Sequence, residues 1–120
     1  MKNILLVEDE EVSRLFLRKF VNKVIPDITI VEACDGEEAL QKFKENKIDL
    51  VVTDIRMPNS DGCDLIKNIR ELDVNVPIVV ESGHKDDLED CTADDIISKP
   101  IKPAEFKKII DKYLWVVRGI

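Results

Sequence analysis

Four polar stretches of the sequence each follow a short apolar run and carry groups that could do chemistry. Three consecutive carboxylates, Glu8 to Glu10, follow the first of these runs, and Asp54 follows the third. The hydroxyl of Ser82 and the ammonium of Lys99 follow the fourth and the fifth. Clustered carboxylates repel one another unless a proton or a metal ion neutralises them, and Mg2+ suits them because it prefers oxygen ligands. With an ammonium group nearby and a carboxylate as nucleophile, this set could receive a phosphoryl group.

Each of these groups alone also has an ordinary structural explanation. The carboxylates of Glu8 to Glu10 could complement the positive end of a following helix. Asp54 and Ser82 could stand in turns, and Lys99, which precedes a proline, could be a solvated loop residue. All of these residues follow predicted strands, and this shared position favours a common binding site, because in an open parallel sheet ligands bind beyond the carboxyl ends of the strands.

Short apolar runs alternate with segments of helical period along the chain. This alternation is typical of β-α-β units around a parallel sheet. The runs are rich in branched residues and almost uninterrupted, which predicts strands that are covered on both faces. The five predicted strands contain Ile4–Val7, Ile28–Val31, Ile48–Val52, Val76–Val80 and Ile96–Ile97.

Helices are predicted between these runs. Before the second run, apolar residues recur at intervals that predict one buried helix face. That face contains Val12, Leu15, Phe16, Phe20 and Val24. Asp35 and Glu38 have the spacing of a capping box and predict the start of a second helix, and further helices are predicted after Gly62 and from Pro103. The polar segment from Ser82 to Asp95 has little periodicity, so a fourth helix there is expected to be short or missing.

The length and charge of the chain restrict its class. With 120 residues it has the size of one domain, and we expect residues 1–120 to form a single one. Its net charge of −7 repels phosphates and anionic lipids, so we expect no direct nucleic acid binding and no membrane association. No apolar run approaches the ~18 residues of a membrane span, and the start does not read as a signal peptide, so we expect a cytoplasmic protein.

The three cysteines predict neither a disulfide framework nor a zinc site. Cys34, Cys63 and Cys91 are widely spaced and form no C-x-x-C motif. We therefore expect free thiols in a reducing compartment.

Over essentially its whole length, the sequence resembles the receiver domains of two-component response regulators. The resemblance implies an α/β fold with a five-stranded parallel sheet, doubly wound and flavodoxin-like, in the strand order 2-1-3-4-5. It also implies that the chain takes a phosphoryl group from a sensor histidine kinase or a phosphotransfer protein and then controls an output domain or partner that the sequence does not identify. The matching motifs are Ile4–Glu10, Asp54–Pro58 with Asp61–Gly62, Pro77–Gly83 and Lys99–Pro100.

The resemblance also implies roles for individual residues. Asp54 would accept the phosphoryl group, while Ser82 would donate its hydroxyl to that group and Lys99 would pair with it. Such a module catalyses only its own phosphorylation and dephosphorylation and is not an enzyme acting on a separate substrate. The Lys99–Pro100 peptide bond is expected to be cis.

The same resemblance implies a magnesium site. Asp9, Asp54 and the backbone carbonyl of Arg56 would bind Mg2+ directly. Glu8, which replaces the commoner aspartate of the acidic pair, would act mainly through a metal-bound water.

Two features depart from the family and leave alternatives open. Ile96 stands where the family often has an aromatic switch residue, and we expect it to be buried. Ser82 and Lys99 are seventeen residues apart, about one helical turn of ~3.6 residues fewer than in the family. A degenerate receiver that acts as a phosphorylation-independent interaction scaffold is therefore the alternative function. Apolar residues from Tyr113 to Val117 most simply belong to the inner face and frayed end of the last helix, with a homodimer contact or the root of a downstream domain as the alternatives.

Other classes that use a similar fold are disfavoured. A phosphatase of the haloacid dehalogenase class requires D-x-D, but Arg56 stands two positions after Asp54. A nucleotide-binding protein would require a glycine-rich phosphate loop, and neither G-x-G-x-x-G nor G-x-x-x-x-G-K-[ST] occurs.

Overall fold

The computed structural model of the protein describes residues 2–25, 27–57, 60–83 and 92–115. Strands and helices alternate along the described chain, as the periodicity predicts. The strands of the main sheet are β1 (Lys2–Val7), β2 (Ile28–Ala33), β3 (Leu50–Asp54), β6 (Ile78–Ser82) and β7 (Asp95–Ser98). The helices are α1 (Glu11–Val24), α2 (Gly36–Glu45), α3 (Gly62–Leu72) and α4 (Pro103–Leu114). A short antiparallel ribbon of β4 (Arg56–Met57) and β5 (Ser60–Asp61) lies between β3 and α3 in the chain.

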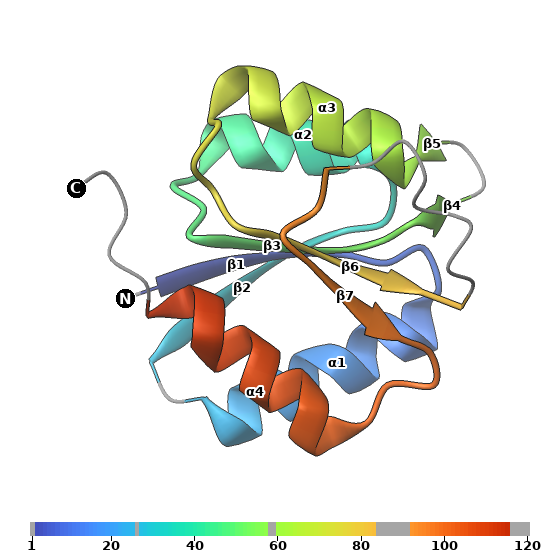
Figure 1. Ribbon diagram of the computed structural model, residues 1–120, viewed down its shortest axis with the longest axis vertical. Coiled ribbons are helices and arrows are strands. Elements are labelled where there is room, and N and C mark those ends of the chain that lie inside the picture. Colours follow the sequence, from blue (N-terminus) through green and yellow to red (C-terminus); the bar gives the residue numbers. More distant parts are fainter. Residues whose placement is uncertain (1, 26, 58–59, 84–91, 116–120) are drawn as a thin grey trace.

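The main sheet has the strand order β2-β1-β3-β6-β7. Every neighbouring pair in it is parallel. Helices α2 and α3 cover one face of the sheet, and α1 and α4 cover the other (Figure 1). The doubly wound sheet is therefore confirmed, and so is the order 2-1-3-4-5, which results when the strands of this sheet are counted along the chain.

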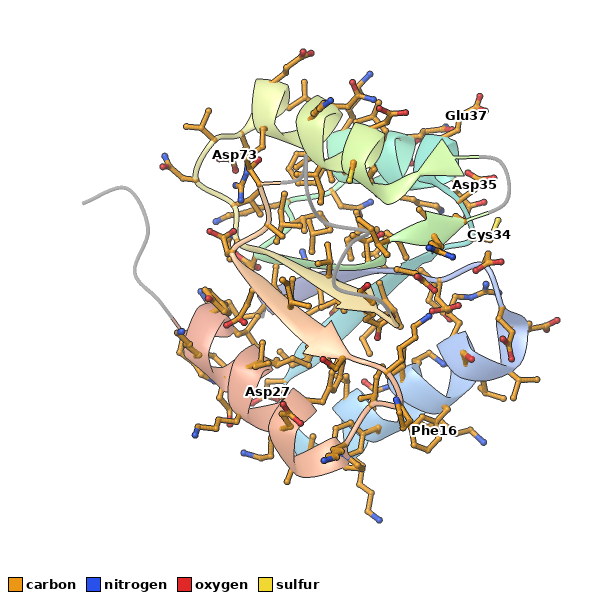
Figure 2. The ribbon with its side chains drawn as sticks, turned by 45° about the vertical axis from the view of Figure 1, so that its right-hand side comes forward. Phe16, Asp27, Cys34, Asp35, Glu37 and Asp73 are labelled. Atoms are coloured by element: carbon orange, nitrogen blue, oxygen red, sulfur yellow. The ribbon has the colours of Figure 1, made fainter. Side chains whose placement is uncertain are left out.

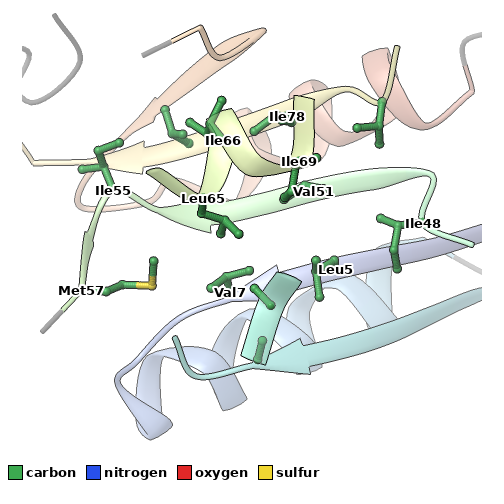
Figure 3. Close-up of a cluster of buried hydrophobic side chains, with 14 residues drawn as sticks. Leu5, Val7, Ile48, Val51, Ile55, Met57, Leu65, Ile66, Ile69 and Ile78 are labelled. Atoms are coloured by element: carbon green, nitrogen blue, oxygen red, sulfur yellow. The ribbon is translucent and has the colours of Figure 1, made fainter. Parts of the chain in front are cut away.

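Two apolar layers hold the helices against the sheet, because successive side chains of a strand point to opposite faces. In Figure 3, Leu5, Val7 and Val51 of the strands lie opposite Leu65 and Ile69 of α3. Burial of one such aliphatic side chain contributes about 1.5–3 kcal/mol. The second layer, which we call the α1/α4 core, contains Ile4, Leu6, Leu17, Val21, Ile25, Leu50, Val52, Val79, Ile97, Phe106, Ile110 and Leu114.

The start of α2 has the cap that the sequence predicts. Oδ1 of Asp35 accepts a hydrogen bond from the backbone N–H of Glu38 at 2.8 Å. This bond satisfies one of the amide groups that the first turn of a helix leaves without an intrahelical partner. Asp35 and Glu37 mark this helix start at the edge of the molecule in Figure 2.

The predicted buried face of α1 is wrong in its first turns. Val12 is 73% exposed and Phe16 is 56% exposed, whereas Leu17 and Val21 are buried. Phe16 lies at the periphery of the molecule (Figure 2). Two overlapping apolar stripes run along this helix, and contact with the sheet and α4 selects the stripe that includes Leu17. Local periodicity alone does not distinguish the two stripes.

Ile96 is 47% exposed, so the expectation that it is buried is wrong. The side chain of the next residue, Ile97, points to the opposite face of the sheet, into the α1/α4 core, and is 1% exposed. Strand β7 lies at the edge of the sheet, and the described residues leave its second face only partly covered. The expected short or missing helix after Ser82 falls largely on residues 84–91, which lie outside the described residues.

Cys63 is disulfide-bonded, whereas Cys34 is a free, exposed thiol. The expectation of free thiols is therefore wrong for Cys63. Spacing along the sequence does not exclude a disulfide, because the fold can bring distant cysteines together. Among the helices described, none is both long enough and apolar enough to span a membrane.

Candidate functional site

Four charged side chains meet at the carboxyl ends of four neighbouring strands. Glu8 follows β1, Asp54 ends β3, Glu81 lies in β6 and Lys99 follows β7. Each of these four residues lies two positions after an apolar residue of the α1/α4 core. Because successive side chains of a strand point to opposite faces of the sheet, all four side chains lie on the same face as that core. The preceding core residues are Leu6, Val52, Val79 and Ile97.

Asp54 and Lys99 form a direct ion pair. Nζ of Lys99 donates to Oδ2 of Asp54 at 2.6 Å. The other oxygen of Asp54, Oδ1, accepts from the backbone N–H of Arg56 at 3.0 Å. Because Asp54 is only 4% exposed, these two contacts fix the direction of a carboxylate that water hardly reaches.

The environment keeps Lys99 protonated. Partial burial lowers the pKa of its ammonium group, but the hydrogen bond and the negative charge of Asp54 raise it, and the net shift is upward. The backbone of Lys99 is also fixed, because its N–H donates to the carbonyl of Ser82 at 3.0 Å. The Lys99–Pro100 peptide bond is cis, as expected.

Glu8, Asp54 and Glu81 form a buried acidic cluster. One carboxylate oxygen from each residue lies within 4.8 Å of the other two. Burial, followed by the charge of Asp54, raises the pKa of Glu8 to about 7. Burial and the charges of Glu8 and Asp54 raise the pKa of Glu81 to about 8. The cluster therefore attracts a proton or a cation.

Glu8 is held in this cluster by the chain around it. Its Oε1 accepts from the backbone N–H of Glu10 at 3.3 Å, and its carbonyl accepts from Nη1 of Arg14 at 2.8 Å. Both donors belong to the start of α1 or the loop before it, so the helix positions the first acidic residue of the site.

The remaining predicted site residues lie around this cluster. Asp9 is exposed and is not among the three clustered acids. Ser82 is 4% exposed and directly follows Glu81 at the end of β6. Arg56 has an exposed side chain, and its amide is anchored on Asp54. The carboxylate oxygens of Glu8, Asp54 and Glu81 fit a hard divalent cation, because such cations prefer oxygen ligands. Both oxygens of Glu81 are buried and accept no hydrogen bond from the described residues.

Glu81 also belongs to the site, although the sequence motifs did not identify it. Its signal was a carboxylate placed directly after the apolar run Val76–Val80, in a strand predicted to be covered on both faces. A charged residue in such a strand either has a partner or belongs to a site. Its pairing with Asp54 across β3 and β6 becomes visible only when the strand register is known.

Comparisons with known proteins give one family. Residues 4–111 match the family model described as the response regulator receiver domain. The chain is 34% identical over 116 residues to the chemotaxis protein CheY of Thermotoga maritima, covering 92% of this chain and 96% of that protein. It is 33% identical over 109 residues to the alkaline phosphatase synthesis transcriptional regulatory protein PhoP of Bacillus subtilis, covering 87% of this chain but 45% of that protein. Other relatives are likewise much longer than the matched region.

Solved structures of the same kind superpose closely. The receiver domain of a sensor histidine kinase from Pseudomonas aeruginosa, with a magnesium ion in its active-site cleft, has a TM-score of 0.87 at 25% identity and covers 96% of this chain and 98% of that one. The response regulator TrrA of Thermotoga maritima, in complex with Mg2+ and beryllofluoride, has a TM-score of 0.86 at 32% identity and covers 95% and 100%. From the family match, the fold and these similarities, the chain belongs to the response regulator receiver domain family and is a phosphoacceptor signalling module of two-component systems.

Proposed function

We propose that Asp54 is the phosphoacceptor and that the reaction depends on magnesium. The observation that carries this proposal is the 2.6 Å pair of Asp54 Oδ2 and Lys99 Nζ inside a buried acidic site at the strand ends. An oxygen of Asp54 forms the new bond to phosphorus while the bond from phosphorus to a histidine nitrogen of the donor breaks. The nitrogen keeps the bonding electron pair. Lys99 then pairs with the phosphoryl oxygens, and the hydroxyl of Ser82 donates to them.

The residues that would hold Mg2+ are Asp9, Asp54 and the carbonyl of Arg56, with Glu8 acting mainly through water. The bound cation would neutralise charge on the phosphoryl oxygens during transfer. The chain itself orients the accepting carboxylate, because the Arg56 amide and Lys99 contact its two oxygens separately. In this proposal the chain catalyses its own phosphorylation and dephosphorylation and converts no separate substrate.

The partners are proposed from the family. A sensor histidine kinase or a phosphotransfer protein supplies the phosphoryl group, and an output domain or a partner protein reads the phosphorylated state. Residues 1–120 are proposed to form one domain, supported by the family match to residues 4–111. A cytoplasmic location agrees with this role. Trp115, which is 52% exposed beside the end of α4, supports a homodimer contact as an alternative use of that surface.

Intact-mass measurement after incubation with Mg2+ and acetyl phosphate tests this function. We expect the wild-type chain to gain the mass of one phosphoryl group and Asp54→Asn to gain none. Asp49→Asn is the matched control, because Asp49 is also a buried aspartate but directly precedes β3, where its Oδ2 accepts from the backbone N–H of Asn3 at 2.8 Å. Full labelling of Asp54→Asn, or labelling that persists in excess chelator, would contradict the proposal.

A further inference from the structure

Glu81 carries a carboxylate whose burial the described residues do not compensate. Its side chain is 0% exposed, and neither Oε1 nor Oε2 has a hydrogen-bond partner among the described residues. A buried charged group is retained at a large energetic cost unless it is paired, protonated or bound to a metal ion. Glu81 is therefore satisfied either by a proton or by a cation.

The position of Glu81 directs this carboxylate into the acidic cluster. Asp54 and Glu81 are register partners in the parallel strands β3 and β6. Their side chains consequently lie on the same side of the sheet, and an oxygen of each lies within 4.8 Å of an oxygen of Glu8. Nζ of Lys99 is already engaged by Asp54 at 2.6 Å. The negative charge near Glu81 thus exceeds the positive charge in contact with the cluster.

We propose that Glu81 contributes a further carboxylate to the divalent cation beside Asp54 and thereby raises the affinity of the unphosphorylated protein for Mg2+ and Mn2+. The inference rests on the proposed magnesium site, but it assigns to Glu81 a role that neither the sequence analysis nor the proposed function includes. Carboxylate oxygens are hard ligands, and additional ligand charge strengthens the binding of divalent cations. Glu81 is long enough to reach the cluster from inside a strand, since one of its oxygens lies within 4.8 Å of an oxygen of Glu8 and of Asp54.

Isothermal titration calorimetry with Mg2+ or Mn2+ alone tests this role in the unphosphorylated chain. Glu81→Gln removes the charge and keeps the shape of the side chain, and it should raise the dissociation constant of either cation about 10-fold or more. Glu71→Gln is the matched control, because it removes the same charge from an exposed side chain on α3. The control should change the dissociation constant by no more than about 3-fold.

A second variant separates cation binding from folding. Glu81→Met replaces the unpartnered carboxylate by an apolar side chain of similar length, so it should remain folded without a divalent cation. Added Mg2+ should raise the thermal unfolding midpoint of the wild-type chain more than that of Glu81→Met, because at equal concentration a ligand that binds more tightly stabilises the folded state more. Wild-type cation affinity in both Glu81 variants, together with an equal thermal shift, would overturn the inference.

The same samples distinguish this inference from the proposed function. Labelling of the wild-type chain by acetyl phosphate reports on Asp54, whereas calorimetry of the unphosphorylated chain reports on the cation. If Asp54 is labelled while the Glu81 variants bind Mg2+ like the wild type, only the role of Glu81 is wrong. If Asp54 is not labelled, the proposed function fails, and the calorimetric comparison still decides the role of Glu81.

Discussion

At the scale of single residues, the two oxygens of the Asp54 carboxylate have different hydrogen-bond partners. Asp54 presents one oxygen to an ammonium group at 2.6 Å and the other to a backbone amide at 3.0 Å. The two contacts together fix the direction of the carboxylate that attacks phosphorus. The neighbouring acids Glu8 and Glu81 instead have pKa values raised by burial, so they are available to a proton or a cation.

Removal of the Lys99 ammonium group should destabilise the fold in the absence of divalent cations. Lys99→Met leaves the buried Asp54 among two other acids without its cationic partner. We expect the free energy of unfolding to fall by about 1–2 kcal/mol, since the lysine side chain is 39% exposed and solvent screens part of the interaction. Urea denaturation in the presence of a chelator measures this change.

Lys108→Met provides the control for that measurement, because it removes the same charge from an exposed position on α4. It should change the free energy of unfolding by less than about 0.5 kcal/mol. Equal effects of the two substitutions would show that the Lys99 interaction contributes nothing specific to stability.

The raised pKa values predict an unusual pH dependence of stability. In the folded chain, burial raises the pKa of Glu8 to about 7 and that of Glu81 to about 8, from an ordinary value of 4.5. Between pH 4.5 and about pH 8 the folded chain therefore binds more protons than the unfolded chain, so the free energy of unfolding should fall as pH rises. The contribution of these groups is complete below about pH 4.5 and lost above about pH 8, with a slope of at most ~1.4 kcal/mol per pH unit for each proton.

Urea denaturation between about pH 5 and pH 9 without divalent cations checks this dependence. Glu81→Gln should make the slope shallower, because only Glu8 then titrates in this range. Stability that rises with pH through the same window in the wild-type chain would contradict the assignment of raised pKa values to this pair.

Residue types and spacing predicted part of the site. Asp54, Glu8 and Lys99 were identified because each follows an apolar run, and the structure brings their charged groups together. Glu81 also follows an apolar run, but nothing local shows that its side chain joins the other charged groups, because it lies within β6. Its inclusion follows from strand register, which depends on packing between residues far apart in sequence.

At the scale of elements, the start of α2 is a local feature that acts independently of the site. The Asp35 side chain accepts the Glu38 amide hydrogen at 2.8 Å. Asp35→Ala should therefore lower the free energy of unfolding by about 1 kcal/mol, and Asp35→Ser, which keeps an accepting oxygen, should lower it much less. Chemical denaturation measures both values, and equal losses in the two variants would show that the cap does not contribute.

Helix positions were predictable from periodicity, but helix orientation was not. The cap at Asp35 and the start at Pro103 are local signals, and both stand in the structure as predicted. The buried face of α1 required knowledge of its contacts, since Val12 and Phe16 remain exposed while Leu17 is buried. The exposure of Ile96 likewise follows from the edge position of β7, which the strand sequence does not encode by itself.

At the scale of the whole molecule, the order of short apolar runs and helical segments was sufficient to predict a doubly wound parallel sheet. Only a small number of topologies allow such alternating elements to bury both sheet faces. The resemblance to receiver domains then supplied the strand order that the structure has. The disulfide-bonded state of Cys63 was not predictable, because a disulfide requires two cysteines to lie close together in space, which their spacing along the sequence does not determine.

The net charge of the chain also predicts that it does not bind nucleic acid. A chain with a net charge of −7 repels nucleic acid phosphates. We expect no specific or non-specific binding to duplex DNA at physiological salt by fluorescence anisotropy, with or without acetyl phosphate. Saturable binding under these conditions would contradict the assignment of this chain to signalling through protein partners.

Asp54 is the residue that we propose carries the phosphoryl group. Reduction of the phosphorylated chain with borohydride converts an aspartyl phosphate into homoserine, and peptide mass spectrometry then locates the modified position. We expect homoserine at position 54, dependent on both Mg2+ and acetyl phosphate and absent from Asp54→Asn. Homoserine at any other position, or a phosphorylated wild-type chain with unmodified Asp54, would contradict it.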